Sequence, residues 1–136
     1  MSLPTLLEQR LRLPLVAAPM FLVSNPALVS ACCNSGIVGS FPALNLRESS
    51  GFSAWLDEIS ASLQPDAAPF AVNLIVHQSN PRLQADLAIC VERRVPIVIT
   101  SLRAPNEVVG PIHSYGGLVF HDVINVKHAK KAIEAG

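Results

Sequence analysis

The stretch LPLVAAPM, residues 13–20, raises the question of the fold, because a continuous apolar run ends at a proline and a methionine instead of a polar turn. Four similar runs follow, at residues 36–44, 70–76, 95–102 and 117–124. They are rich in valine, isoleucine and leucine and show no polar alternation, which is typical of strands buried on both faces. The five runs therefore predict the parallel strands of an α/β protein.

Segments with helical periodicity lie between these runs. Asn25-Pro26 and Asn80-Pro81 each predict a helix N-cap followed by a proline at the first helical position. Apolar residues at positions 52, 55, 56, 59 and 63 form one stripe of a third helix. A helix over 105–117, interrupted at Gly110-Pro111, and a last helix over 125–136 complete the pattern. Strands and helices are thus expected to alternate along the whole chain.

This alternation predicts right-handed crossovers and a parallel sheet. A complete (β/α)8 TIM barrel takes about 250 residues, whereas this chain has 136. We expect parallel (β/α) units that form roughly the first five of a TIM barrel. Residues 1–136 would then be the N-terminal part of one barrel domain, truncated before its C-terminal units. A flavodoxin-like, five-stranded doubly wound sheet is the alternative.

Composition and charge exclude several classes of partner. The chain is 50% hydrophobic and 15% charged, and its formal net charge is zero, so nothing in its charge favours binding to nucleic acid or to an anionic membrane. No window reaches the roughly 18–20 apolar residues of a membrane span, and no signal-peptide pattern is present. The three cysteines are expected to be reduced core residues. A cytoplasmic protein with neither nucleic-acid nor membrane partners is expected.

Polar residues near the ends of the later strands are the candidate site. Ligands of parallel α/β folds lie beyond the carboxyl ends of the strands, where Asn73, Thr100 and His121 occur. Asn73 interrupts an apolar run, and an unpaired buried amide costs about 1–3 kcal/mol, so it contacts either a neighbouring strand or a polar ligand. His121 either lines a ligand pocket or is a hydrogen-bonded histidine of the barrel mouth. No phosphate loop and no GxGxxG fingerprint occur, which argues against ATP and Rossmann dinucleotide binding. The histidines have no HExxH or CxxC context, so no metal site is expected.

Several stretches, taken together, resemble one known family. LPLVAAPM, SACCNSGIVGSFPALN, PFAVNLIVHQSNPR, VPIVITS and GGLVFHDVINVKHAKKAIEAG are similar to the N-terminal part of the nitronate monooxygenases, formerly called 2-nitropropane dioxygenases. The resemblance extends from about Leu13 to Gly136. Its most specific elements are the first strand ending in a methionine and the strand that begins PFAVN.

The resemblance implies an FMN-binding (β/α)8 barrel. The stretch around residues 18–20 would lie against the flavin ring, residue 73 would reach its polar edge, and residues 100 and 121 would line the neighbouring rim. Many family members have a glycine pair before the methionine, whereas this chain has Ala18-Pro19 and so lacks one backbone N–H there. The family's catalytic histidine lies beyond this stretch, so no catalytic residue is assigned. The implied cofactor contacts are Ala18, Pro19, Met20, Asn73, Thr100 and His121.

The implied reaction is the FMN-dependent oxidation of alkyl nitronates by molecular oxygen. The partner would be a small-molecule substrate, a nitronate or similar compound, and a homo-oligomer is possible. The 136-residue chain alone is expected to bind FMN weakly and to turn over negligibly. An FMN-dependent enoyl reductase or NAD(P)H:quinone reductase of the same barrel family is one alternative. A non-catalytic, truncated α/β module is the alternative from another class.

Overall fold

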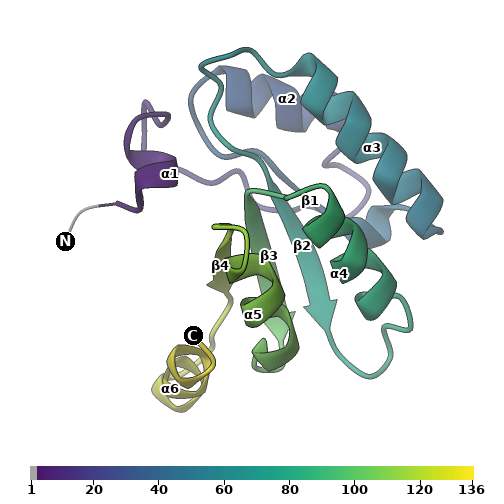
Figure 1. The fold of residues 1–136 in the computed structure, drawn as a ribbon, viewed down its shortest axis with the longest axis vertical. Helices are drawn as coiled ribbons and strands as arrows, with labels where there is room; N and C mark the ends of the chain where they lie inside the picture. Colours follow the sequence, from purple (N-terminus) through teal and green to yellow (C-terminus); the bar gives the residue numbers. More distant parts are fainter. Residues whose placement is uncertain (1–2) are drawn as a thin grey trace. The chain divides into compact units, whose positions relative to one another are not determined.

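The computed structural model describes residues 3–136. The chain divides into two compact units, Met1–Val72 and Asn73–Gly136. Strands and helices follow one another along most of the chain (Figure 1). The strands are β1 (Ser40–Pro42), β2 (Ala71–Val76), β3 (Ile97–Leu102) and β4 (Leu118–His121). The helices are α1 (Thr5–Glu8), α2 (Pro26–Asn34), the 3-10 helix η1 (Ala43–Asn45), α3 (Ser49–Ser62), α4 (Leu83–Glu92), α5 (Asn106–His113) and α6 (Val126–Glu134).

The strands form one sheet in the sequential order β1-β2-β3-β4. The N–H of Ala71, at the start of β2, donates to the carbonyl of Gly39 at 2.8 Å. β3 and β4 pair in parallel, with Ile97 opposite Leu118 and Thr100 opposite His121. A flavodoxin-like sheet would place its first strand between two others, so the sequential order rules out that alternative. Parallel strands added one after another confirm the prediction of a partial TIM-barrel-like fold.

The first expected strand is the main correction to the predicted elements. Residues 13–20 form no regular strand and contribute one parallel bridge, between Val16 and Val38. Pro14 and Pro19 lack an N–H and confine the pairing to the residues between them. Leu15 and Val16 are exposed, where a strand buried on both faces was predicted. The run expected at 36–44 is likewise reduced to the three residues of β1.

One of the two expected asparagine caps forms, at Asn25, and a further asparagine, Asn125, caps α6. The Oδ1 atom of Asn25 accepts a hydrogen bond from the N–H of Leu28 at 2.9 Å, and α2 begins with Pro26. Asn125 caps α6 in the same way through the N–H of His128, also at 2.9 Å. In both cases the side chain satisfies an N–H that has no partner within the helix.

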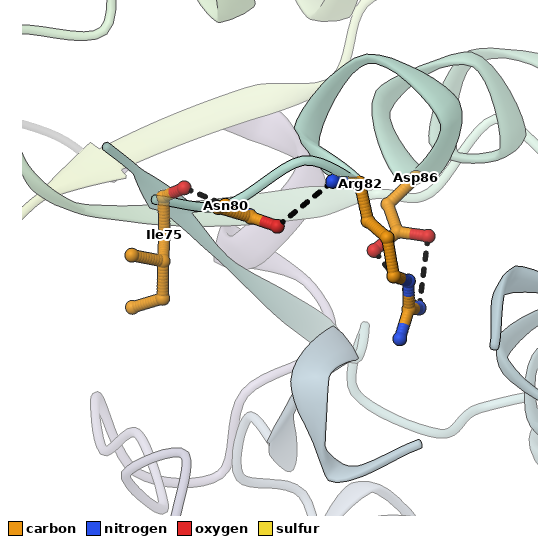
Figure 2. Close-up of polar contacts among 4 residues, drawn as sticks. All are labelled: Ile75, Asn80, Arg82 and Asp86. Atoms are coloured by element: carbon orange, nitrogen blue, oxygen red, sulfur yellow. Dashed lines mark hydrogen bonds and ion pairs between the residues drawn. The ribbon is translucent and has the colours of Figure 1, made fainter. Parts of the chain in front are cut away.

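The cap predicted at Asn80-Pro81 is wrong, because α4 begins only at Leu83. Figure 2 shows that Asn80 instead braces the loop after β2: its amide donates to the carbonyl of Ile75 at 3.0 Å and accepts from the N–H of Arg82 at 3.1 Å. Arg82 also pairs with the fully buried Asp86 at 3.0 Å. Asn80 therefore belongs to a turn, and the helix begins two residues later than expected.

Each unit has its own apolar core. In the first unit, the ring of Phe41 lies 6.0 Å from Phe52 and 5.7 Å from Trp55, and Phe52 and Ile59 on α3 are fully buried, as the predicted stripe requires. In the second unit, β3 and α5 supply the core, and α5 runs through Pro111 without interruption. α6 buries no residue. None of the helices within residues 3–136 is long and apolar enough to cross a membrane.

Candidate functional site

A hydrogen-bonded chain of polar side chains joins the third residue of β2 to the C-terminal end of β3 and to the residue that follows β4. Asn73, which is 6% exposed, donates from Nδ2 to the carbonyl oxygen of Ile99 and to Oγ of Ser101, both at 3.0 Å. Ser101 in turn donates to Oδ2 of Asp122 at 2.9 Å. We call Asn73, Ser101 and Asp122 the amide chain. It connects the middle of β2 to the end of β3 and to the residue after β4 through side chains alone.

The amide chain fixes the orientation of Asn73. A carbonyl oxygen can only accept, so the contact with Ile99 identifies the atom of Asn73 that faces it as the amide nitrogen. Both amide hydrogens of Asn73 are then used. Its Oδ1 atom accepts no hydrogen bond from any residue between 3 and 136. A nearly buried asparagine therefore offers one open acceptor for a ligand.

A second pair of polar residues lies one position away along the same strands. Oγ1 of Thr100 lies 2.8 Å from Nδ1 of His121 and 3.2 Å from the carbonyl oxygen of Phe120. Thr100 is completely buried, whereas His121 is half-buried. The hydroxyl has one hydrogen, which it donates to the carbonyl oxygen of Phe120. It therefore accepts from Nδ1 of His121, and Nδ1 carries the ring hydrogen.

The two groups lie on opposite faces of the sheet, because successive side chains of a strand point to opposite faces. Thr100 and Ser101 are consecutive in β3, so the amide chain and the Thr100–His121 pair cannot share a face. The structure thus brings together Thr100 and His121 from the predicted set, and it separates both from Asn73. Residues that were expected to line one rim together belong to two faces.

The turn at Ala18-Pro19-Met20 lies in the first unit and is held by its own contacts. The N–H of Met20 donates to Oγ of Ser24 at 3.0 Å, and its carbonyl accepts from the N–H of Ser24, also at 3.0 Å. Asn45 completes the turn by donating to the carbonyl of Ser24 at 2.8 Å. Since Pro19 has no N–H and that of Met20 is used, the turn offers a ligand the N–H of Ala18 and the exposed side chain of Met20.

Sequence reasoning did not select Ser101 or Asp122 as site residues. Ser101 could have been predicted, because a buried amide such as that of Asn73 requires hydrogen-bond partners and the neighbouring strand offers the Ser101 hydroxyl. The register between β3 and β4, which pairs Thr100 with His121 and so brings Asp122 beside Ser101, is not readable from periodicity. The amide chain is therefore a product of tertiary pairing.

Metal ligation and thiol chemistry find little support in the part of the chain that the structure describes. No three His, Cys, Asp or Glu side chains within residues 3–136 gather as metal ligands would. All three cysteines are free, and Cys33 and Cys90 are buried. Burial raises the pKa of the Cys33 thiol from 9.0 to about 11, and burial also raises the pKa of Cys90. Both thiols stay protonated and unreactive near neutral pH.

Comparison with known proteins gives structural likeness but no sequence match. No protein-family model matches the chain, and no curated protein matches it in sequence. Among solved structures, FabK from Thermotoga maritima is similar with a TM-score of 0.83 and 22% identity, over 96% of this chain and 40% of that one. A point mutant of the same FabK gives the same TM-score and identity, over 96% and 42%. The likeness shows the fold, and this chain spans less than half the length of those proteins.

Proposed function

We propose that this chain is the opening part of an FMN-dependent oxidoreductase of the nitronate monooxygenase type. The observation that carries the proposal is Asn73, whose Oδ1 atom remains an open acceptor although the side chain is almost fully buried. Oδ1 of Asn73 is not one of the fully buried side-chain atoms that lack a partner, so it stays accessible to water, and a ligand N–H could take the place of that water. A flavin ring edge, which carries N–H groups, is a ligand of that chemistry.

The residues of this chain would bind and orient the cofactor. Asn73 would accept from a ring N–H, while Ser101 and Ile99 hold its amide in place. Ala18, Pro19 and Met20 would supply a backbone N–H and an apolar side chain against the ring. Bound FMN would supply the redox chemistry, taking electrons from the substrate and passing them to oxygen. No catalytic acid or base is assigned to this chain.

Thr100 and His121 have a different place in the proposal. Because they face away from Asn73, they would support the rim from behind. Their 2.8 Å contact joins the ends of β3 and β4 and keeps the neighbouring Ser101 and Asp122 in register. Their replacement should therefore loosen flavin binding without removing a direct contact.

An FMN-dependent enoyl reductase or NAD(P)H:quinone reductase is the alternative within the same fold. The amide chain would support flavin binding in each case, and residues at the ends of other strands would determine the substrate specificity. The experiment uses the full-length product of the gene, loaded with FMN. Oxygen uptake with an alkyl nitronate, without a nicotinamide, is the expected result.

Oxidation of NADH or NADPH that depends on an enoyl thioester or a quinone, with no nitronate-dependent oxygen uptake, would replace the proposed reaction by the alternative. Failure of the protein to retain FMN at all would overturn the flavin proposal itself. The two failures are distinguished because flavin retention is read from the visible spectrum before any substrate is added.

A further inference from the structure

A basic pocket of about 290 Å³ lies in the second unit, on the face opposite to Asn73. Its lining comes from the loop after β3, the end of β4 and one side of α6, and it comprises Leu102, Arg103, Ala104, His121, His128 and Lys131. Its volume is at the lower end of the range for small-molecule sites, which is about 300–1,000 Å³. Four of the six residues carry a cationic or nitrogen-donor side chain.

The backbone turns sharply where Arg103 enters the pocket. Leu102 has a φ of 81°, which is rare for a residue with a branched side chain. The N–H of Arg103 then donates back to the carbonyl of Val76 at 3.2 Å and ties the loop to β2. The arginine is thus presented from a fixed backbone position.

His121 is also held in place. Its Nδ1 atom is engaged by the buried Thr100 at 2.8 Å, so the ring is anchored on one side. Its Nε2 atom has no hydrogen-bond partner within the described part of the chain. With Nδ1 donating to Thr100, Nε2 is an acceptor in the neutral ring and donates to an anion only in the cationic ring. His128 and Lys131 stand three residues apart on α6, a spacing that places both on one face of the helix.

The cations of the pocket are not neutralised by the protein. No carboxylate among residues 3–136 forms an ion pair with Arg103 or Lys131. Three acidic residues stand near them in sequence: Glu107, which accepts a hydrogen bond from Gln84, Asp122, which is engaged by Ser101 on the other face, and Glu134, one turn along α6. Since the whole chain has zero formal net charge, the pocket is a local concentration of positive charge.

We propose that this pocket binds a phosphate-bearing anion, either free phosphate or a phosphate monoester. Donors that converge from three separate elements match the three terminal oxygens of a phosphate group better than the two of a carboxylate. Arg103 would supply a planar, two-pronged contact and Lys131 a point charge. The site would act independently of the flavin proposal, because it uses none of the atoms of Asn73, Ser101 or Asp122.

The test is an NMR titration of the 15N-labelled protein with inorganic phosphate, glycerol phosphate and acetate at constant ionic strength. Saturable shifts confined to residues 102–104, 121 and 128–131 are expected with the two phosphates. Arg103→Gln and Lys131→Gln should each weaken binding about tenfold. Lys130→Gln is the matched control, since it removes the same charge from the same helix but Lys130 does not line the pocket.

Tighter binding of glycerol phosphate than of phosphate would assign the site to a phosphate ester, and the reverse order would assign it to the free ion. Acetate that binds as tightly as phosphate would overturn the phosphate assignment. Equal losses in Lys130→Gln and Lys131→Gln, or shifts spread over the surface without saturation, would show general charge attraction and no site. Lys131 is exposed, so its variant should keep the native spectrum and remain interpretable.

Discussion

Replacement of Asn73 should reveal how much the amide chain contributes to stability. Asn73→Ala removes two hydrogen bonds of 3.0 Å. Each hydrogen bond contributes about 1 kcal/mol, so the expected loss in the free energy of unfolding is about 2 kcal/mol. The Ile99 carbonyl, which loses the bond from Asn73, keeps its place in the strand, so it adds little to this loss. Urea unfolding followed by circular dichroism measures it. Asn106→Ala, at an exposed position with no side-chain cap, should change stability by less than about 0.5 kcal/mol.

Asn73→Asp has nearly the same shape but should cost more at neutral pH. The new carboxylate cannot donate to Ile99, and it would stand close to Ser101 and the negative charge of Asp122. Burial and that charge would raise its pKa in the folded state above the unfolded value of about 3.9. The stability present at low pH is then lost as the pH rises through the folded pKa. The gap between the variant and the native protein should therefore narrow in acid.

Two results would refute this account of Asn73. One is a cost for Asn73→Ala no larger than that for Asn106→Ala, which would mean that the two hydrogen bonds contribute nothing. The other is an Asn73→Asp variant that is as stable as the native protein at pH 7, which would show that the position does not require a donor. Either outcome would also remove the argument that the amide is held rigid for a ligand.

Further predictions concern packing, ionisation and charge. Gly39→Ala should cost about 1–3 kcal/mol, because its Cβ would overlap the backbone oxygen of Val29 in α2. Gly110→Ala, with nothing within 4 Å of its Cβ, should stabilise α5 by up to about 1 kcal/mol, and thermal unfolding compares the two variants. The free energy of unfolding should fall as the pH rises from 9 to 11, because burial raises the pKa of Cys33 from 9.0 to about 11 and also raises that of Cys90, so the folded state keeps protons that the unfolded state loses. Cys33→Ala should make this fall smaller, and a fall of unchanged size would contradict the prediction for Cys33. Arg82→Met should lower the free energy of unfolding by up to about 3 kcal/mol, because Asp86 stays buried without its ion pair. If adding Asp86→Leu restores the free energy of unfolding, the loss comes from the unpaired charge and not from lost packing of Arg82.

Local signals of the sequence determined most of the fold. The continuous apolar runs at 70–76 and 95–102 became β2 and β3 almost at their expected bounds, because a run with no polar alternation suits a strand covered on both faces. Asn25 capped its helix as predicted, because the cap involves a neighbour only three residues away. Where the outcome depends on contacts within three or four residues, the pattern predicts it well.

The predictions were wrong where distant partners decide the structure. The run at 13–20 looks like a strand by composition, but its prolines and its exposure leave a single bridge at Val16. Asn80-Pro81 has the composition of a cap, yet Oδ1 of Asn80 accepts from the N–H of Arg82 in a turn that precedes the helix, and its amide nitrogen is bound to the carbonyl of Ile75. The division of the candidate site between two faces follows from the register of β3 with β4, which no local pattern encodes.

The central claim is that Asn73 holds its open acceptor for a flavin. The most direct measurement is the FMN affinity of the full-length gene product and of its Asn73→Ala and Ser101→Ala variants, by titration of flavin fluorescence. Asn73→Ala should weaken FMN binding about tenfold, since about 1.4 kcal/mol corresponds to that factor. Ser101→Ala keeps the Oδ1 atom of Asn73 and should weaken binding much less. Equal FMN affinity in the native protein and Asn73→Ala would contradict the claim.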